Sequence, residues 1–170
     1  ADPDALSVEE MVEIVKNAGI VGMGGATFPT DVKTVAGMGR VDTLIANACE
    51  CEPYITADDA LLCTYPEQVL RGMGVLMAVL EPKRAVLAVE DNKSEAVGIL
   101  KKQMETFPGI ELLILPTRYP QGAEKQLIQA VTGRQVPPGA LPKDVGCAVF
   151  NAATFASIYK AVYEGEPVTR

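Results

Sequence analysis

The sequence predicts an α/β fold built on a parallel sheet of about four strands, with helices on both faces of the sheet. Four short apolar runs, partly β-branched, have the length and composition of buried strands: Thr43–Asn47, Arg84–Glu90, Ile110–Leu115 and Val145–Phe150. Helical patterns follow them in turn: Pro66–Leu80, Ser94–Thr106, Ala123–Thr132 and Thr154–Tyr163. Strand followed by helix, repeated along the chain, is typical of a parallel sheet that is covered on both faces.

A helix precedes the first strand. Ser7 and Glu10 have the spacing of a capping box, in which each side chain bonds the other residue's backbone N–H. The helix should therefore begin after Ser7 and run to about Ala18, where Gly19 can take the left-handed conformation that ends it.

A glycine-rich loop, Gly22–Phe28, follows this helix and leads to Pro29, which is expected to open a second short helix. Glycines let backbone N–H groups approach an anion, and the positive end of the next helix can face a phosphate. The pattern is GxGG before a helix, not GxGxxG after a strand. A phosphate cradle and a simple packing loop therefore both remain open from the pattern alone.

Composition excludes several classes of function. The 170 residues are enough for one domain with its own core. The net charge of −7 gives no long-range attraction to nucleic acid or to anionic lipid. The longest apolar runs are far shorter than the roughly 20 residues that a membrane helix needs, so no direct membrane insertion is expected.

The cysteine and histidine content points to chemistry carried out by a cofactor. The sequence contains no histidine, which removes Ser-His-Asp and Cys-His catalysis and most transition-metal sites. The four cysteines include no CxxC pair, so neither a zinc motif nor an iron–sulfur motif can be written and no metal site is expected. Cys49 and Cys51 are best interpreted as spectators, and Cys63 and Cys147 as core residues in a reducing cytoplasmic setting.

Parallel sheets bind ligands beyond the carboxyl ends of their strands, and all four predicted strands are followed by polar segments. These segments are residues 47–53 (NACECEP), 90–93 (EDNK), 116–122 (PTRYPQG) and 151–154 (NAAT). Glu50 and Glu52 can accept hydrogen bonds from ribityl hydroxyls or flavin ring nitrogens, although a solvated loop explains them equally well. Gly122 suits a close backbone approach, and Glu124 either faces a ligand or complements the helix dipole. Asp58 and Asp59 are expected to start a helix without a catalytic role.

Taken together and in order, several segments resemble the C subunits of Rnf electron-transport complexes. They are GMGGATFPTDVK, ECEPYITADD, EDNK, TRYPQGAEKQLIQAVTGRQVPPGALP and VGCAVFNAATFASIYKAV, which extend from about Gly19 to Val162. Those subunits are similar to the NADH-oxidising flavin subunit of respiratory complex I. The resemblance implies a Rossmann-like domain that binds FMN non-covalently, with NADH stacked against the flavin.

The resemblance also implies a role for individual residues at this site. Gly22, Gly24, Gly25 and Ala26 correspond to the glycine loop around the flavin, Phe28 to an aromatic ring stacked on the dinucleotide, and Lys33 to a nearby cation. Asn47, Glu50 and Cys51 correspond to a polar turn at the flavin, Gly122 and Glu124 to a turn beside NADH and the flavin, and Asn151 and Thr154 to the turn that holds the FMN phosphate. No side chain is expected to be catalytic in its own right, because the cofactors carry the chemistry.

For the whole protein, the resemblance implies an NADH:flavin oxidoreductase component of an ion-translocating complex that couples electron transfer between NADH and ferredoxin to ion transport. We expect residues 1–170 to form a single FMN- and NADH-binding domain of a longer subunit. The [4Fe-4S] clusters would lie in the C-terminal part beyond this domain. Partners would be the other subunits of the complex and, indirectly, ferredoxin, on the cytoplasmic face of the membrane.

Two other functions remain open at this point. A cobalamin reductase of bacterial microcompartments shares the glycine loop and the ECEP turn, although YITAD and YPQGAEKQL fit the Rnf family better. A scaffold without cofactor, which only docks neighbouring subunits, is the alternative from a different functional class.

Overall fold

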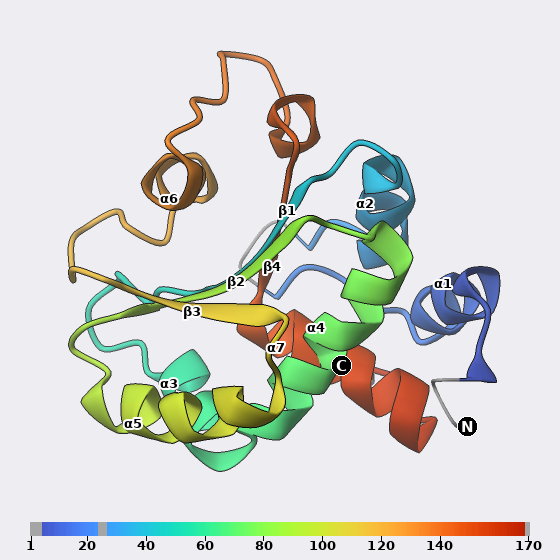
Figure 1. The fold of residues 1–170 in the computed structure, drawn as a ribbon, viewed down its shortest axis with the longest axis horizontal. Coiled ribbons are helices and arrows are strands. Elements are labelled where there is room, and N and C mark those ends of the chain that lie inside the picture. Colours follow the sequence, from blue (N-terminus) through green and yellow to red (C-terminus); the bar gives the residue numbers. More distant parts are fainter. Residues whose placement is uncertain (1–4, 24–26, 169–170) are drawn as a thin grey trace.

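The computed structural model describes residues 5–23 and 27–168 as one parallel sheet with helices on both faces (Figure 1). The strands are β1 (Thr43–Ala48), β2 (Arg84–Glu90), β3 (Ile110–Leu115) and β4 (Cys147–Asn151), in the order β3-β2-β1-β4. All three pairings are parallel. The predicted α/β class and the number of strands are confirmed.

Helices on one face of the sheet form the larger of two cores. α3 (Ala57–Thr64), α4 (Pro66–Leu80), α5 (Ser94–Gln103) and α7 (Ala152–Tyr159) lie on this face, which is the lower face in Figure 1. They pack against alternate strand residues such as Leu44, Leu87 and Phe150, all buried. α1 (Val8–Asn17) and α2 (Thr30–Gly37) lie beyond α4, and α1 adds Met11 and Val15 to the same core.

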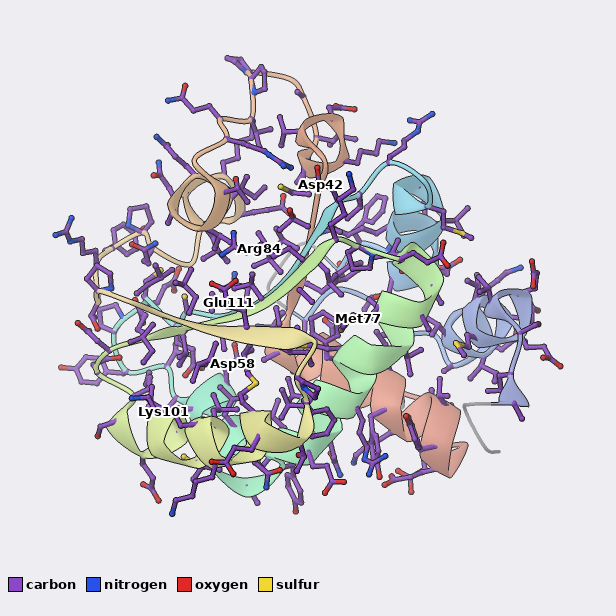
Figure 2. The ribbon with its side chains drawn as sticks, viewed as in Figure 1. Asp42, Asp58, Met77, Arg84, Lys101 and Glu111 are labelled. Carbon is purple, nitrogen blue, oxygen red and sulfur yellow. The ribbon has the colours of Figure 1, made fainter. Side chains whose placement is uncertain are left out.

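The α-helix α6 (Glu124–Thr132) packs on the opposite face of the sheet (Figure 1). Its Leu127 and Ile128 are fully buried against Ile45 and Val86, the strand residues that alternate with those of the larger core. Figure 2 shows Arg84 and Glu111 between α6 and the sheet. The Arg84 guanidinium pairs with Glu111 and also donates to the backbone carbonyl of Val131 in α6, so it ties this helix to β2 and β3.

The close packing of α4 on α7 depends on a glycine. A Cβ atom at Gly72 would lie 1.9 Å from the backbone carbonyl oxygen of Phe155 in α7, a distance at which backbone must shift. A Cβ atom at Gly74, further along α4, would meet nothing within 4 Å. The first position is therefore restricted by the α4–α7 contact and the second is not.

Several predicted boundaries are wrong by a few residues. The fourth strand begins at Cys147, because Pro142–Val145 form a 3-10 turn that Gly146 ends with a left-handed φ of 74°. α7 begins at Ala152, two residues earlier than predicted, since the Asn151 side chain caps its first turn. α5 ends at Gln103, three residues earlier than predicted, and the chain continues as a 3-10 turn.

The N-terminal predictions are confirmed. Ser7 and Glu10 form the capping box, α1 ends before Ala18, and Gly19 has a left-handed φ of 67°. Pro29 precedes α2 as its N-cap. None of the helices in the described part of the chain is long and apolar enough to cross a membrane.

The order of the strands places a topological switch between β1 and β4. From β1 the chain moves through β2 to β3 on one side, and then returns to add β4 on the other side of β1. In open parallel sheets, ligands bind at the carboxyl edge beside such a point.

Candidate functional site

The site lies at the carboxyl edge of the sheet, where β1 and β4 are paired directly. Asn47 near the end of β1 is the register partner of Asn151 at the end of β4. Three further segments converge on these two strand ends: the glycine loop, the connection from β3 to α6, and the start of α3.

The glycine loop is anchored at both of its ends. The backbone N–H of Gly22 donates to the carbonyl of Phe28 over 2.9 Å, and an isolated antiparallel bridge joins Val21 to Pro29. The backbone N–H of Met23 donates to the hydroxyl of Thr154 in the first turn of α7, over 3.2 Å. The described ends of the loop therefore lie beside the start of α7, while Gly24, Gly25 and Ala26 fall outside the described residues.

Lys33 joins the first turn of α2 to α6 and β4. Its ammonium group lies 2.8 Å from Oε1 of Glu124 and donates to the backbone carbonyl of Val149. It also lies over the ring of Phe150, 5.0 Å from the centroid. Lys33 and Glu124, predicted from separate segments, are thus direct partners, and both side chains remain partly open to solvent.

Gly122 packs against the turn that follows β1. A Cβ atom at this position would lie 2.2 Å from the backbone carbonyl oxygen of Cys49, so the close approach predicted for Gly122 is present. Its carbonyl accepts from the Asn47 side chain over 2.9 Å, and its N–H donates to the Cys51 sulfur over 3.3 Å. Asn47, Cys51 and Gly122 therefore form one contact between the turns that follow β1 and β3.

The Glu50 side chain is buried and bound to other groups of the protein, so its interpretation as part of a solvated loop is wrong. Its carboxylate accepts from the backbone N–H groups of Asp58 and Asp59 at the start of α3, over 2.8 and 3.1 Å. The Lys93 ammonium group lies 3.4 Å from Glu50 Oε2, and both side chains are almost completely buried. Glu50 thus fixes the turn after β1 to α3 and to the start of α5.

Asp58 connects the same cluster to the end of β4. Its Oδ2 accepts from the Asn151 side-chain amide over 2.7 Å, and Asn151 Oδ1 accepts in turn from the backbone N–H of Ala153. Burial raises the pKa of Asp58 to about 6, with the hydrogen bond from Asn151 acting in the opposite direction. Figure 2 places Asp58 on the α3 side of the sheet.

Two further titratable groups are buried at this edge. The Glu90 side chain is fully buried, and among the described residues neither of its carboxylate oxygens has a partner of normal hydrogen-bond geometry. Burial raises the pKa of Glu90 and raises the pKa of the Cys49 thiol to about 12. Cys49 is therefore a neutral thiol near pH 7 and is not poised for thiolate chemistry.

Sequence reasoning assigned no role to Asp58 and Lys93, although both belong to this cluster. An aspartate in the first turn of a helix is explained by the helix dipole alone, so Asp58 does not indicate a functional site from its sequence position. Lys93 in EDNK follows the end of β2, and the one available signal was its place among the four polar strand ends.

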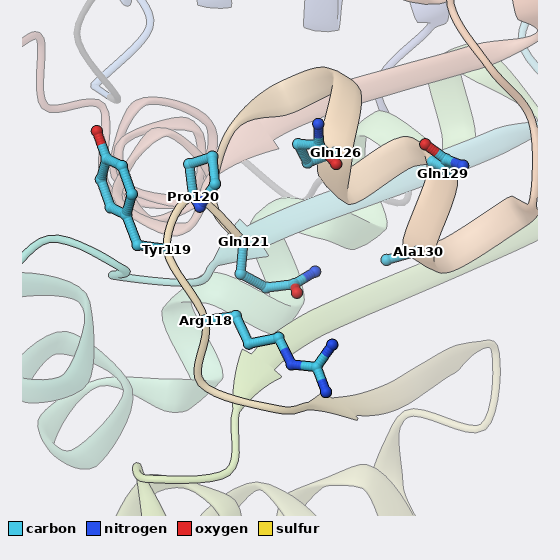
Figure 3. Close-up of a pocket in the computed structure, with 7 residues that line it drawn as sticks. All are labelled: Arg118, Tyr119, Pro120, Gln121, Gln126, Gln129 and Ala130. Atoms are coloured by element: carbon cyan, nitrogen blue, oxygen red, sulfur yellow. The ribbon is translucent and has the colours of Figure 1, made fainter.

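A pocket next to this edge contains none of the predicted site residues. It has a volume of about 340 Å³ and lies between α6 and the connection that leads to it (Figure 3). Arg118 and Gln121 line it together with Gln126, Gln129 and Ala130 of α6. The pocket adjoins the Gly122–Glu124 turn in the chain but is distinct from the converging strand ends.

The donor set at the strand ends fits a flavin nucleotide better than a metal ion. Among the described residues, no group of three or more Cys, Asp or Glu side chains is arranged to hold a metal. Lys33 supplies a cation, and the exposed Phe28 ring supplies an apolar surface for stacking. The start of α7, beside the glycine loop, supplies the positive end of a helix dipole for a phosphate.

Comparison with known proteins agrees with this fit. A family model described as the Nuo51 FMN-binding domain matches residues 15–160. The chain is 43% identical over 99% of its length to the C subunit of the ion-translocating oxidoreductase complex of Vibrio cholerae, and 44% identical over 99% to that of Serratia proteamaculans. It spans 22% and 24% of those relatives, about a quarter of their length.

A solved structure shows the same fold. It is described as "Crystal structure of NAD+-reducing [NiFe]-hydrogenase in the H2-reduced state", and it matches 95% of this chain and 32% of its own with a TM-score of 0.85 and 26% identity. The air-oxidised form gives a TM-score of 0.80 over 92% of this chain. The predicted resemblance to Rnf C subunits is confirmed, and the chain belongs to the Nuo51 FMN-binding domain family.

Proposed function

We propose that this chain binds FMN and NADH and aligns them for hydride transfer, as one domain of an ion-translocating oxidoreductase complex. The observation that carries the proposal is the convergence of the predicted segments on one edge. Met23 contacts Thr154, Asn47 contacts Gly122, and Lys33 contacts Glu124, although these pairs are far apart in sequence. Membership of an FMN-binding family supports the cofactor assignment.

Different groups at this edge would bind different parts of the two cofactors. The glycine loop and the first turn of α7, with Asn151 and Thr154, offer N–H groups and a positive helix end to the phosphate. Asn47 and the turn at Glu50 and Cys51 would border the ring and ribityl chain. Phe28, which is 53% exposed, would stack on the nicotinamide dinucleotide.

Bound FMN would supply the redox chemistry, since a flavin accepts two electrons as a hydride and can release them one at a time. The chain would contribute alignment and exclusion of water, which lower the barrier without acid–base catalysis. Lys33 and Glu124 would hold α2 and α6 together beside the dinucleotide. Their partial exposure leaves them able to contact a ligand.

In the whole protein, the electrons would pass to [4Fe-4S] clusters outside this domain and on to other subunits, with ferredoxin as a distant partner. The relatives are named as subunits of an ion-translocating oxidoreductase complex, which supports the assignment of other subunits as partners. Ion translocation requires a membrane, so the domain would be peripheral, at the cytoplasmic face. A cobalamin reductase and a cofactor-free scaffold are not favoured by these relatives.

The proposal is tested by anaerobic mixing of the FMN-loaded protein with NADH. Loss of the visible flavin absorbance, saturable in NADH, is the expected result. Fluorescence titration with FMN and with riboflavin measures the contribution of the phosphate, and FMN should bind more tightly. Failure of the protein to bind FMN, or a bound flavin that NADH does not bleach, contradicts the proposal. Stimulation of NADH oxidation by cobalamin would favour the reductase instead.

A further inference from the structure

Asp58 has contacts to the ends of two strands through two different groups. Its backbone N–H donates to Glu50 Oε1 in the turn after β1, over 2.8 Å. Its side-chain Oδ2 accepts from Asn151 Nδ2 at the end of β4, over 2.7 Å. Asp58 is only 9% exposed, so these contacts are largely shielded from competing water. A single residue therefore bridges the topological switch between β1 and β4.

Two hydrogen bonds fix which way the Asn151 amide faces, and one of them is to the Asp58 carboxylate. An ionised carboxylate only accepts hydrogen bonds, so it holds the Asn151 NH₂ group towards itself. The Asn151 carbonyl oxygen then faces the opposite way and accepts from the backbone N–H of Ala153 over 2.9 Å, which caps α7. The next residue, Thr154, accepts from Met23 in the glycine loop. The chain of contacts thus runs from Asp58 to the proposed phosphate site.

We propose that Asp58 is a positioning residue of the flavin site, which fixes the Asn151 amide at the start of α7 and so orders the groups that would receive the FMN phosphate. The inference rests on the proposed function. Asp58 would not touch the cofactor, since both of its described contacts are to the protein. Its influence on FMN affinity would be transmitted through Asn151 and the first turn of α7.

The protonation state of Asp58 should therefore control FMN affinity. A protonated carboxyl group can donate as well as accept and carries no charge, so it holds the Asn151 NH₂ group less strongly and leaves the Ala153 N–H as the main constraint on the amide. Charged groups act on Asp58 from two other elements: Glu50 from the turn after β1 and Lys93 from the start of α5. Asp59, the next residue of α3, donates its backbone N–H to the same Glu50 carboxylate. Glu90 at the end of β2 and the neutral Cys49 thiol belong to the same buried cluster. Because burial raises the pKa of Asp58 to about 6, affinity should fall as the pH drops through that value.

The test is a fluorescence titration with FMN from about pH 5 to about pH 8, for the unaltered protein and for Asp58→Asn. Asparagine keeps the shape but is neutral at every pH. From the alkaline to the acid end, the FMN affinity of the unaltered protein should fall by a factor about ten times larger than the factor by which that of Asp58→Asn falls. The FMN phosphate titrates in this range in both proteins, so the comparison cancels its effect. At the alkaline end Asp58→Asn should bind about ten-fold more weakly than the unaltered protein.

Glu95→Gln is the matched control. Glu95 is also in the first turn of a helix near this edge and loses the same charge, but it is exposed. The substitution should leave FMN affinity and its pH profile unchanged. In the cofactor-free protein, the Asn151 side-chain amide NMR signals should titrate with a midpoint near that of Asp58, and Asp58→Asn should abolish the titration.

Each outcome separates the positioning role from the proposed function. If the unaltered protein binds FMN and Asp58→Asn binds it equally well with the same pH profile, the positioning role is wrong and the proposed function stands. If the unaltered protein binds no FMN at any pH, both are wrong. If Glu95→Gln weakens binding as much as Asp58→Asn does, net charge explains the effect and the positioning role is again wrong.

Discussion

The Lys33 ammonium group lies 2.8 Å from Oε1 of Glu124. This ion pair joins the first turn of α2 to the first turn of α6. The two residues are 91 positions apart in the sequence. Lys33 also donates to the Val149 carbonyl in β4, so it contacts the sheet as well as both helices. If this ion pair serves the site, its substitution should slow FMN reduction. If it only stabilises the fold, its substitution should lower the stability.

We expect Lys33→Met and Glu124→Gln to slow the reduction of bound FMN by NADH by roughly 100-fold, because misplacement of the dinucleotide by about 1 Å has an effect of that size. Stability should change by less than about 1 kcal/mol, since partly exposed ion pairs contribute little. Anaerobic rapid mixing gives the rate and urea unfolding gives the stability. Arg71→Met, which breaks the exposed Arg71–Glu67 pair in α4, is the control and should leave the rate unchanged. An unchanged rate in both site variants would refute the assignment.

Gly122→Ala should weaken FMN binding by about ten-fold or more and destabilise the fold by about 1–3 kcal/mol. Its Cβ atom would lie 2.2 Å from the Cys49 carbonyl oxygen, so the turns after β1 and β3 must separate. Gly98→Ala in α5 is the matched control, because its Cβ atom meets nothing within 4 Å. That substitution should increase stability by up to about 1 kcal/mol through helix propensity. Wild-type FMN affinity in Gly122→Ala would show that the close approach is irrelevant to the site.

Gly72→Ala tests the packing of α4 on α7. The new Cβ atom would lie 1.9 Å from the Phe155 carbonyl oxygen, so the helices must move apart and the unfolding free energy should fall by about 3 kcal/mol. Gly74→Ala lies in the same helix with open space around it and should be neutral or stabilising. Urea unfolding of both variants gives the comparison. Equal stabilities for the two variants would contradict the described contact.

Asp58→Asn should stabilise the fold near neutral pH even though it weakens FMN binding. The folded-state pKa of about 6 lies above the usual 3.8, so the folded protein binds this proton more tightly than the unfolded chain does. Ionised Asp58 therefore disfavours folding above pH 6, by about 3 kcal/mol, and this cost disappears as the pH falls through 6 towards 3.8. Urea unfolding should show Asp58→Asn more stable than the unaltered protein at neutral pH, with the difference vanishing in acid. Loss of stability at neutral pH would indicate a purely structural residue.

Much of the fold could be predicted from the sequence because its signals are local. The four apolar runs, the Ser7–Glu10 capping box and the left-handed Gly19 each follow from a few adjacent residues, and all three are confirmed. The start of β4 was missed because the Val145 side chain suits a strand, whereas Gly146 ends a 3-10 turn just before it.

The site was predictable to the level of segments but not of contacts. Polar residues at strand ends located the edge, and the family resemblance supplied the residues. The Asp58–Asn151 hydrogen bond was not predictable, since it depends on the order β2-β1-β4, which brings two distant strand ends together. Whether Glu50 was buried also could not be read from its own sequence neighbourhood, because Lys93, which covers it, follows a different strand.

The most direct test of the central claim is a crystal structure of the protein with FMN bound. The flavin should lie at the carboxyl ends of β1 and β4, with its phosphate towards the start of α7 and the glycine loop. A flavin bound elsewhere, for example in the pocket lined by Arg118 and Gln121, or no bound flavin at a saturating concentration, would contradict the account.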